Sequence, residues 1–121
     1  MILIYVAGPY RADSVWALHQ NIAAARKIGA VIAQCGAYPV IPHSNTAFFD
    51  GCAPDRLFLQ GTLALMKKCD GVVFTHNWRT SIGAREEMRQ AKMNGIPFII
   101  GTSKVGKLIR DIGGFHGKFA Q

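Results

Sequence analysis

The stretch Ile2-Leu-Ile-Tyr-Val-Ala-Gly-Pro9 decides the fold. It is a short run of apolar, β-favouring residues that stops at Gly8-Pro9, which is typical of a buried strand followed by a tight turn. The next segment starts with the helix-capping residues Asp13-Ser14 and repeats apolar residues at helical spacing as far as Gly36. A buried strand followed at once by an amphipathic helix predicts an α/β protein.

The alternation of strand and helix continues along the chain. The expected strands are residues 2–7, 38–41, 72–74 and 97–100, and the expected helices are residues 15–36, 55–68, 82–95 and a last amphipathic turn at 105–112. Residues 43–54 are expected to form a loop, and the glycine-rich residues after 112 a loose tail. The segment 38–41 contains Pro39 and is closed by Pro42, so we expect it at an edge of the sheet.

Short connections and right-handed crossovers favour a single domain over residues 1–121. We expect a doubly wound, flavodoxin-like or Rossmann-like parallel sheet of four to five strands, in the order 2-1-3-4, covered by helices on both faces.

Composition narrows the function classes. Half of the 121 residues are hydrophobic, which is enough for one compact core, and every apolar stretch is interrupted well before about 20 residues. The amino terminus has no basic flank or cleavage pattern, so we expect a soluble cytoplasmic protein without a membrane partner.

Three cysteines without a CxxC pair predict reduced core residues, and four histidines without HxxH or HExxH spacing give no metal site. No cofactor is expected.

The net charge of +7 implies attraction to anions. The basic residues are dispersed, and only the carboxyl-terminal stretch forms a basic strip, without the interleaved aromatic residues of a single-strand-binding surface. We therefore do not expect nucleic acid as a partner, whereas a small molecule that carries a phosphate fits the charge.

A helix-forming run near the third strand carries a notable carboxylate, Glu87. In Ser81-Ile-Gly-Ala-Arg-Glu-Glu-Met-Arg-Gln-Ala91-Lys-Met-Asn-Gly95-Ile-Pro97, the small or apolar positions 84, 88, 91 and 95 share one helical face. Glu87 borders that face, so we expect it at the edge of the core and Glu86 in solvent. The alternative is that both are ordinary first-turn acids favoured by the helix dipole.

Several polar or flexible residues follow the expected strands. In a doubly wound fold, residues 8–11, 76–83 and Glu87 should meet at the carboxyl edge of the sheet. Gly8 allows close backbone approach and Arg11 can hold a phosphate, while Ser81 with the amides of Gly83 and Ala84 forms an anion-accepting helix start. The structural alternatives are a plain turn at Gly8-Pro9, a surface charge at Arg11 and a helix cap at Ser81.

Three sequence blocks resemble the nucleoside 2-deoxyribosyltransferase superfamily. They are Tyr5-Val-Ala-Gly8-Pro-Tyr-Arg11, Cys69-Asp70 before a buried strand, and Ser81-x-Gly83-x-x-x-Glu87 followed by Gly95-x-Pro97. The pattern is similar to the 2′-deoxynucleoside 5′-monophosphate N-glycosidases and to small uncharacterised bacterial and phage relatives, and it spans roughly residues 2–100.

This resemblance implies an enzyme in which Glu87 attacks the anomeric carbon of a nucleotide and Tyr5 orients the carboxylate. A carboxylate suits this chemistry, because cleavage of an N-glycosidic bond builds oxocarbenium character that a nearby anion stabilises and traps. Water would then give a hydrolase and a second base a transferase. Ser81 stands where the nucleoside transferases carry an aspartate, and together with Arg11 it favours a 5′-phosphate. The expected substrate contacts are Gly8, Pro9, Tyr10, Arg11, His43, Asn45, Trp78, Ser81, Gly83 and Ala84.

The chain departs from the superfamily at Thr62, where a second aspartate usually handles the leaving base. His43 or Asp50 could supply that proton, although a histidine that caps a turn and a plain Asp50-Gly51 turn are the alternatives. Trp78 could be a lid or a base-stacking surface, or equally a core or dimer contact. Asp70 is interpreted as a structural turn residue.

Two other functions compete with this reading. One is a non-catalytic protein that binds a nucleotide or a nucleotide derivative. The other is a phosphoribohydrolase of the cytokinin-activating type, but the chain lacks the double glycine and threonine of its Pro-Gly-Gly-x-Gly-Thr-x-x-Glu loop. Because related enzymes complete their sites at subunit contacts, we also expect a homodimer or larger homo-oligomer.

Overall fold

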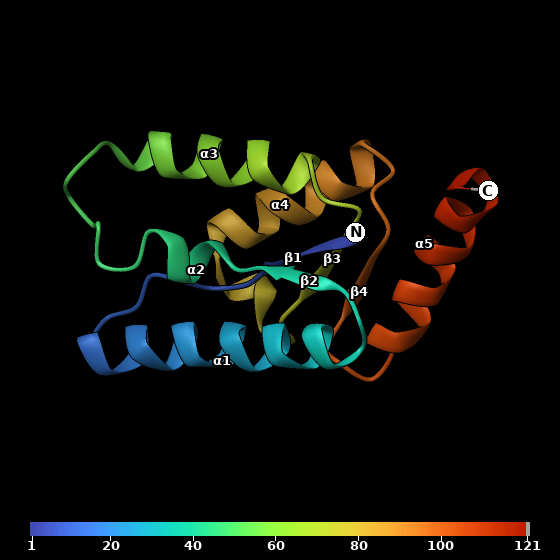
Figure 1. Cartoon of the computed structure of the whole chain (residues 1–121). Coiled ribbons are helices and arrows are strands. Elements are labelled where there is room, and N and C mark those ends of the chain that lie inside the picture. Colours follow the sequence, from blue (N-terminus) through green and yellow to red (C-terminus); the bar gives the residue numbers. More distant parts are fainter. Residues whose placement is uncertain (121) are drawn as a thin grey trace.

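The computed structural model describes the backbone of residues 1–120 and the side chains of residues 1–114 (Figure 1). The strands are β1 (Leu3–Ala7), β2 (Tyr38–Val40), β3 (Gly71–Phe74) and β4 (Phe98–Ile100). The helices are α1 (Val15–Gln34), α2 (Pro42–Asn45), α3 (Asp55–Lys67), α4 (Ile82–Met93) and α5 (Val105–Ala120), and a 3-10 turn, η1 (Trp78–Thr80), precedes α4.

The four strands form one parallel sheet in the order β2-β1-β3-β4. The register places Tyr5 beside Val40 on one side and Val72 on the other, and Val73 beside Ile99. The α/β class, the parallel sheet, its order and the edge position of β2 are therefore confirmed. All the strands point the same way, so their carboxyl ends share one edge.

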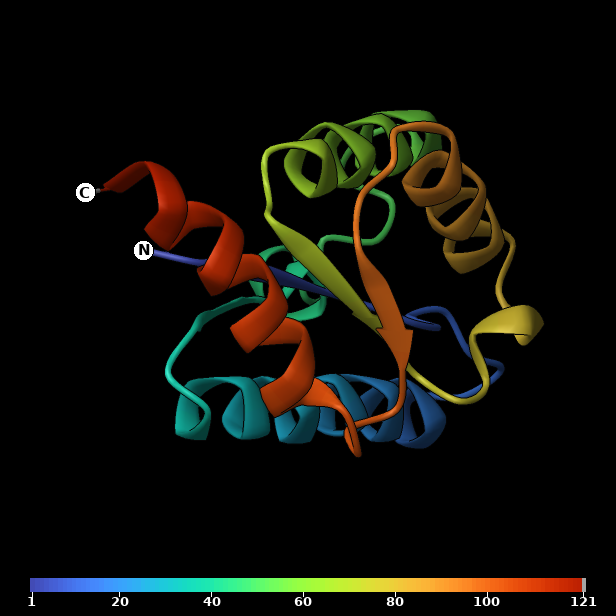
Figure 2. The same ribbon diagram turned by 90° about the vertical axis from the view of Figure 1, so that its right-hand side faces the viewer.

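Helices cover both faces of the sheet, as expected (Figure 2). Alternate strand residues point to opposite faces. Ile4, Val6 and Val73 pack in one core with residues of α1 and α5. Tyr5 and Phe74 pack in a second core with Met66 of α3 and Met88 of α4. The pleat of β1 therefore directs Tyr5 toward the face that carries α4.

Two segments differ from the sequence prediction. The expected loop at 43–54 begins instead as the short helix α2, because Pro42 occupies the first helical turn, where a missing N–H costs nothing. The expected loose tail after residue 112 is helical, since α5 continues to Ala120. The amphipathic pattern at 105–112 predicted the start of α5 but not its length, because Gly113-Gly114 lowers helix propensity without preventing helix.

The predictions for Gly95 and for the three cysteines are partly confirmed. Gly95 follows α4 with φ of 63°, which confirms the predicted left-handed end. The prediction of three core cysteines is wrong for two of them, because Cys35 and Cys52 are exposed and only Cys69 is buried. Cys35 ends α1, and Cys52 lies in the segment between α2 and α3. Neither belongs to the two cores of the sheet.

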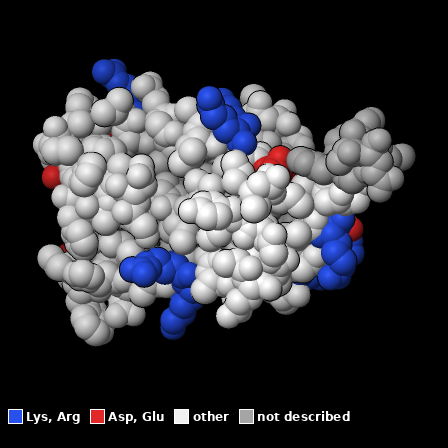
Figure 3. Space-filling view, in the orientation of Figure 1, with Lys and Arg blue, Asp and Glu red and all other residues white. Residues whose placement is uncertain are grey.

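Basic side chains do not form one continuous patch on the face drawn in Figure 3. Lysine and arginine appear there as separate spots, which agrees with the dispersed charge of the sequence. Within the described residues, no helix combines the length and the apolar character needed to cross a membrane.

Asp70 connects the beginnings of β1 and β3. The Leu3 N–H donates to the Asp70 carboxylate at 2.8 Å, and the Asp70 N–H donates to the Leu3 carbonyl at 2.8 Å. The structural role predicted for Asp70 is thus confirmed.

Replacing Asp70 should weaken this connection. We expect Asp70→Ala to lower the free energy of unfolding by about 1–3 kcal/mol, because the partly buried Leu3 N–H loses its acceptor. Asp70→Asn retains a carbonyl oxygen and should cost less. Urea unfolding followed by circular dichroism measures both, and an Asp70→Ala midpoint equal to that of the wild type would contradict the assignment.

Candidate active site

A buried hydrogen bond joins β1 to α4 at the centre of the candidate site. Tyr5 is fully buried and Glu87 is 6% exposed, and the Tyr5 hydroxyl donates to Oε2 of the Glu87 carboxylate. Glu87 shares its helical face with the buried residues Ala84, Met88 and Ala91. The prediction that Glu87 borders the core is confirmed, and the Tyr5–Glu87 contact expected from the resemblance is present.

The neighbouring Glu86 lies at the surface of α4. Its side chain is 29% exposed and forms an ion pair with Arg89, and Gln90 also donates to it. The Arg89 hydrogen bonds lower the pKa of Glu86 to about 2. Two adjacent carboxylates thus have opposite environments, because a helix rotates by about 100° per residue.

Burial has the opposite effect on Glu87. It raises the pKa of the carboxyl to about 7, and the hydrogen bond from Tyr5 opposes that rise. Burial, followed by the charge of Glu87, raises the pKa of Tyr5 well above its usual value. Tyr5 therefore remains a protonated donor at neutral pH, and Glu87 changes its charge near neutral pH.

Thr62 lies beside this pair. Its interaction with the Tyr5 hydroxyl lowers the pKa of Tyr5, and its own hydroxyl donates to the Leu59 carbonyl at 3.0 Å. Thr62, where the sequence differs from the pattern that it resembles, thus lies next to Tyr5 with a neutral hydroxyl.

The carboxyl ends of β1 and β3 meet at Gly8 and Thr75. A Cβ atom on Gly8 would lie 2.5 Å from Cγ2 of Thr75, so a glycine is required where these two segments touch. Thr75 is buried, and within the described part of the chain its hydroxyl has no hydrogen-bond partner. Sequence reasoning missed Thr75, although a hydroxyl directly after the buried segment 72–74 was an available signal.

His43 supports the turn after β1. Its Nε2 lies 3.0 Å from the carbonyl oxygens of both Gly8 and Pro9, and burial lowers the pKa of the ring. The neutral ring with its proton on Nε2 donates to these carbonyls, which leaves Nδ1 as a buried acceptor without a partner among the described residues. His43 therefore lies at the site, but its N–H is engaged with the backbone.

Tyr10 and Asp50 connect the turn after β1 to the segment between α2 and α3. The Tyr10 hydroxyl donates to Asp50 at 2.7 Å and accepts from the Phe48 N–H at 2.7 Å. Burial and the Asp50 hydrogen bond raise the pKa of Tyr10. Asp50 is exposed, as is Asn45 at the end of α2. Asp50 thus does more than form a turn with Gly51, because it holds the Tyr10 hydroxyl.

The two expected phosphate-binding groups have partners within the chain. Nη2 of Arg11 lies 2.6 Å from Oδ1 of Asp55, and both side chains are exposed. Ser81 accepts the Ala84 N–H at 3.1 Å and caps α4, which confirms the helix-cap alternative. The prediction that the Ala84 amide faces an anion is wrong, because Ser81 already accepts that N–H. An exposed ion pair contributes at most about 1 kcal/mol, so a phosphate could displace Asp55 from Arg11.

Trp78 packs near the buried pair. Its ring lies 5.9 Å from the Phe74 ring, and Cζ of Arg79 lies 4.5 Å above it. The half-buried ring joins the apolar core that contains Tyr5, and its Nε1 is a buried donor without a partner among the described residues. Of the alternatives for Trp78, the core contact is present in the structure.

Two hollows lie elsewhere on the surface. One, of about 620 Å³, lies between β4 and α5, and the other, of about 480 Å³, between α3 and α4. Neither is lined by Tyr5 or Glu87. Cavity size therefore does not locate this site, and we locate it by the buried hydrogen bond between Tyr5 and Glu87. No group of three metal-ligating side chains gathers anywhere among the described residues.

Comparison with known proteins assigns the chain to a family. Residues 2–100 match the family described as "Domain of unknown function (DUF7768)". The chain belongs to this family. No curated protein matches the chain. The DUF7768 domain contains every residue of the candidate site, from Tyr5 to Glu87, whereas α5 lies beyond the matched range.

The raised pKa of Glu87 predicts how stability depends on pH. Glu87 changes from its ordinary pKa of 4.5 in the unfolded chain to about 7 in the fold, so the native state binds more protons between these values. Its contribution is fully present below pH 4.5 and is lost as the pH rises through about 7, by about 3 kcal/mol in total. Glu87→Gln should remove this loss.

Glu86→Gln is the matched control. The pKa of Glu86 is lowered to about 2, so its contribution is present above its ordinary value of 4.5 and is lost as the pH falls toward 2. Urea unfolding from pH 4 to pH 8 measures both variants. If Glu87→Gln has the same pH dependence as the wild type, Glu87 does not have the raised pKa.

Proposed function

We propose that the DUF7768 domain cleaves the N-glycosidic bond of a nucleoside 5′-monophosphate, with a deoxyribose sugar, through a covalent glycosyl-Glu87 intermediate. The observation that carries the proposal is the buried hydrogen bond between Tyr5 of β1 and Glu87 of α4. It agrees with the resemblance to the nucleoside 2-deoxyribosyltransferase superfamily. The proposed substrate is a cytoplasmic metabolite, which agrees with the location expected from the sequence.

The proposed reaction has two steps. A Glu87 oxygen attacks C1′, the C1′–N bond breaks, and its electron pair leaves with the base, which takes up one proton from solvent water. Water, or the nitrogen of a second base, then attacks C1′ and loses one proton to solvent, and the C1′–O bond to Glu87 breaks with its electron pair returning to the carboxylate. Tyr5 donates to Oε2 throughout and keeps the carboxylate oriented, so the other oxygen is the proposed nucleophile.

Ionisation of Glu87 controls the first step. Only the carboxylate can attack C1′, and its pKa of about 7 leaves a substantial fraction protonated at neutral pH. The Tyr5 hydrogen bond favours the ionised form, because it lowers the pKa against the effect of burial.

The substrate must also reach the carboxylate. A reacting carbon has to approach within about 3–3.5 Å of the attacking oxygen, and Glu87 is only 6% exposed. The proposal therefore requires covering side chains to move when the nucleotide binds.

Arg11, with Ser81 and the amides at the start of α4, is the proposed phosphate site. Arg11 would exchange Asp55 for the 5′-phosphate, which offers a stronger, doubly charged acceptor. The Ser81 cap holds the first turn of α4 in place, so the amides of Ile82 and Gly83 can face an anion.

The second candidate is a nucleotide-binding protein without catalysis. Two observations favour it: the burial of Glu87, and the neutral Thr62 beside Tyr5 where the superfamily usually has an acid. Calorimetry with nucleoside monophosphates separates the two, because binding without release of free base supports the second candidate.

Activity measurements test the leading candidate directly. With a panel of deoxynucleoside and ribonucleoside monophosphates, we expect release of free base by the wild type and a loss of at least about 10³-fold in Glu87→Ala, because the nucleophile is removed. The rate should rise with pH through about 7 as Glu87 ionises. Tyr5→Phe should move that limb to higher pH, since the hydrogen bond that lowers the Glu87 pKa is lost. Equal base release by wild type and Glu87→Ala would reject the proposal.

The phosphate site has its own test. Arg11→Ala should raise KM for a nucleoside 5′-monophosphate by about tenfold or more and leave KM for the free nucleoside unchanged, because only the monophosphate loses a charged partner. Asp55→Asn, which keeps Arg11 and removes its partner, is the control and should not raise either KM. An equal effect of Arg11→Ala on both substrates would contradict a phosphate contact.

A further inference from the structure

The two edges of the sheet differ in their ability to accept another strand. On β2, the Tyr38 N–H donates to the Ile2 carbonyl at 2.9 Å, so Tyr38 directs its backbone groups toward β1 and Pro39 directs its own outward. Proline has no N–H to donate. Pro39 therefore hinders the pairing of another strand with β2, as prolines on edge strands commonly do.

The β4 edge has no such protection. Pro97 accepts from the Val72 N–H at 2.9 Å and the Gly101 N–H donates to Phe74 at 2.8 Å, so these alternate residues face β3. Phe98 and Ile100 lie between them and direct their N–H and C=O groups outward. No hydrogen bond within the described structure uses these four groups.

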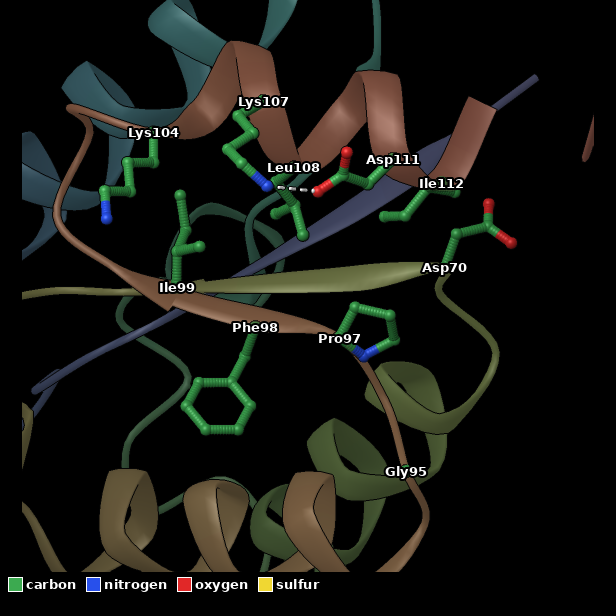
Figure 4. A pocket seen from close by; sticks show the side chains of 10 residues that line it. All are labelled: Asp70, Gly95, Pro97, Phe98, Ile99, Lys104, Lys107, Leu108, Asp111 and Ile112. Carbon is green, nitrogen blue, oxygen red and sulfur yellow. Dashed lines mark hydrogen bonds and ion pairs between the residues drawn. The ribbon is translucent and has the colours of Figure 1, made fainter. Parts of the chain in front are cut away.

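A groove of about 620 Å³ runs along this open edge, between β4 and α5 (Figure 4). Ile99 and Leu108 form part of its apolar wall. Lys104 lies at the carboxyl end of β4, and Asp70 lies at the opposite end, with Asp111 on that side of Lys107. Lys107 and Asp111 form an ion pair at 2.8 Å, so Lys104 marks the basic end of the groove and Asp70 the acidic end.

We propose that this edge binds a second copy of the chain, with β4 antiparallel to the partner's β4 across a two-fold axis at Ile99. Phe98 then lies opposite Ile100 of the partner subunit in both halves, and the outward groups form four backbone hydrogen bonds. The two sheets join into one sheet of eight strands. The interface does not rest on the proposed function.

The charges at the two ends of the groove favour a second copy of the chain as its occupant. An antiparallel pair brings the lysine end of each groove to the aspartate end of the other, so the opposite charges meet twice. A uniformly acidic strand would instead place a negative charge against Asp70. The Ile99 side chains pack on the face of the sheet that α5 covers, so two of them meet at the axis within apolar surroundings.

Light scattering and sedimentation of the full chain test the proposal. We expect the wild type to have twice the chain mass of 13.2 kDa. Ile100→Pro removes an outward donor without removing a bond to β3 and should give the monomer mass. Tyr38→Lys, on the opposite edge, is the matched control and should keep the dimer.

Exchanging two charges tests whether the two β4 strands are antiparallel, and it leaves the residues of β4 unchanged. Lys104 and Asp111 are both exposed, so their substitution leaves the core intact. Lys104→Glu removes the cation that faces the acidic end of the other groove, and Asp111→Lys releases Lys107 and adds a second cation at that end. Each should raise the dimer Kd by about tenfold, and the double variant should restore it. A monomeric wild type, a dimer that survives Ile100→Pro, or a double variant no tighter than the single ones would each overturn the proposal.

Discussion

The candidate site depends on one constraint, a carboxylate that is held out of water by the packing of a parallel sheet. Glu87 has a buried position because α4 packs against the side of the sheet to which β1 directs Tyr5. Burial alone would favour a neutral carboxyl, and the Tyr5 hydroxyl partly restores the charge. The pair thus sets both the geometry and the ionisation of the proposed nucleophile.

The surroundings of this pair are rigid on one side and adjustable on the other. Gly8 touches Thr75 with no room for a Cβ, and His43 holds the Gly8 and Pro9 carbonyls. The Arg11 side chain, by contrast, forms an exposed ion pair with Asp55. In the proposed reaction Arg11 exchanges Asp55 for the phosphate, whereas the Gly8–Thr75 contact stays fixed. Burial of Glu87 leaves the nucleotide-binding alternative open to the same measurements.

Much of the fold could be predicted because its signals are local. Apolar runs of three to six residues and helical periodicity predicted the order of strands and helices, and handedness rules then predicted the sheet order 2-1-3-4. Where the local signal was weak the prediction was wrong: Pro42 was interpreted as the end of a strand and begins α2, and Gly113-Gly114 was interpreted as a tail and lies within α5. Cys35 and Cys52 are exposed because residue type alone does not fix burial.

The sequence by itself determined the strand and helix order, the Ser81 cap and the position of Glu87 at the border of the core, since each follows from neighbours along one element. The resemblance added Tyr5 as its partner. Only the tertiary structure decided that Arg11 pairs with Asp55, that Thr75 closes on Gly8 and that β4 presents an open edge beside α5. These contacts join residues far apart in the chain, so their distances are set by how the layers pack and not by any local pattern.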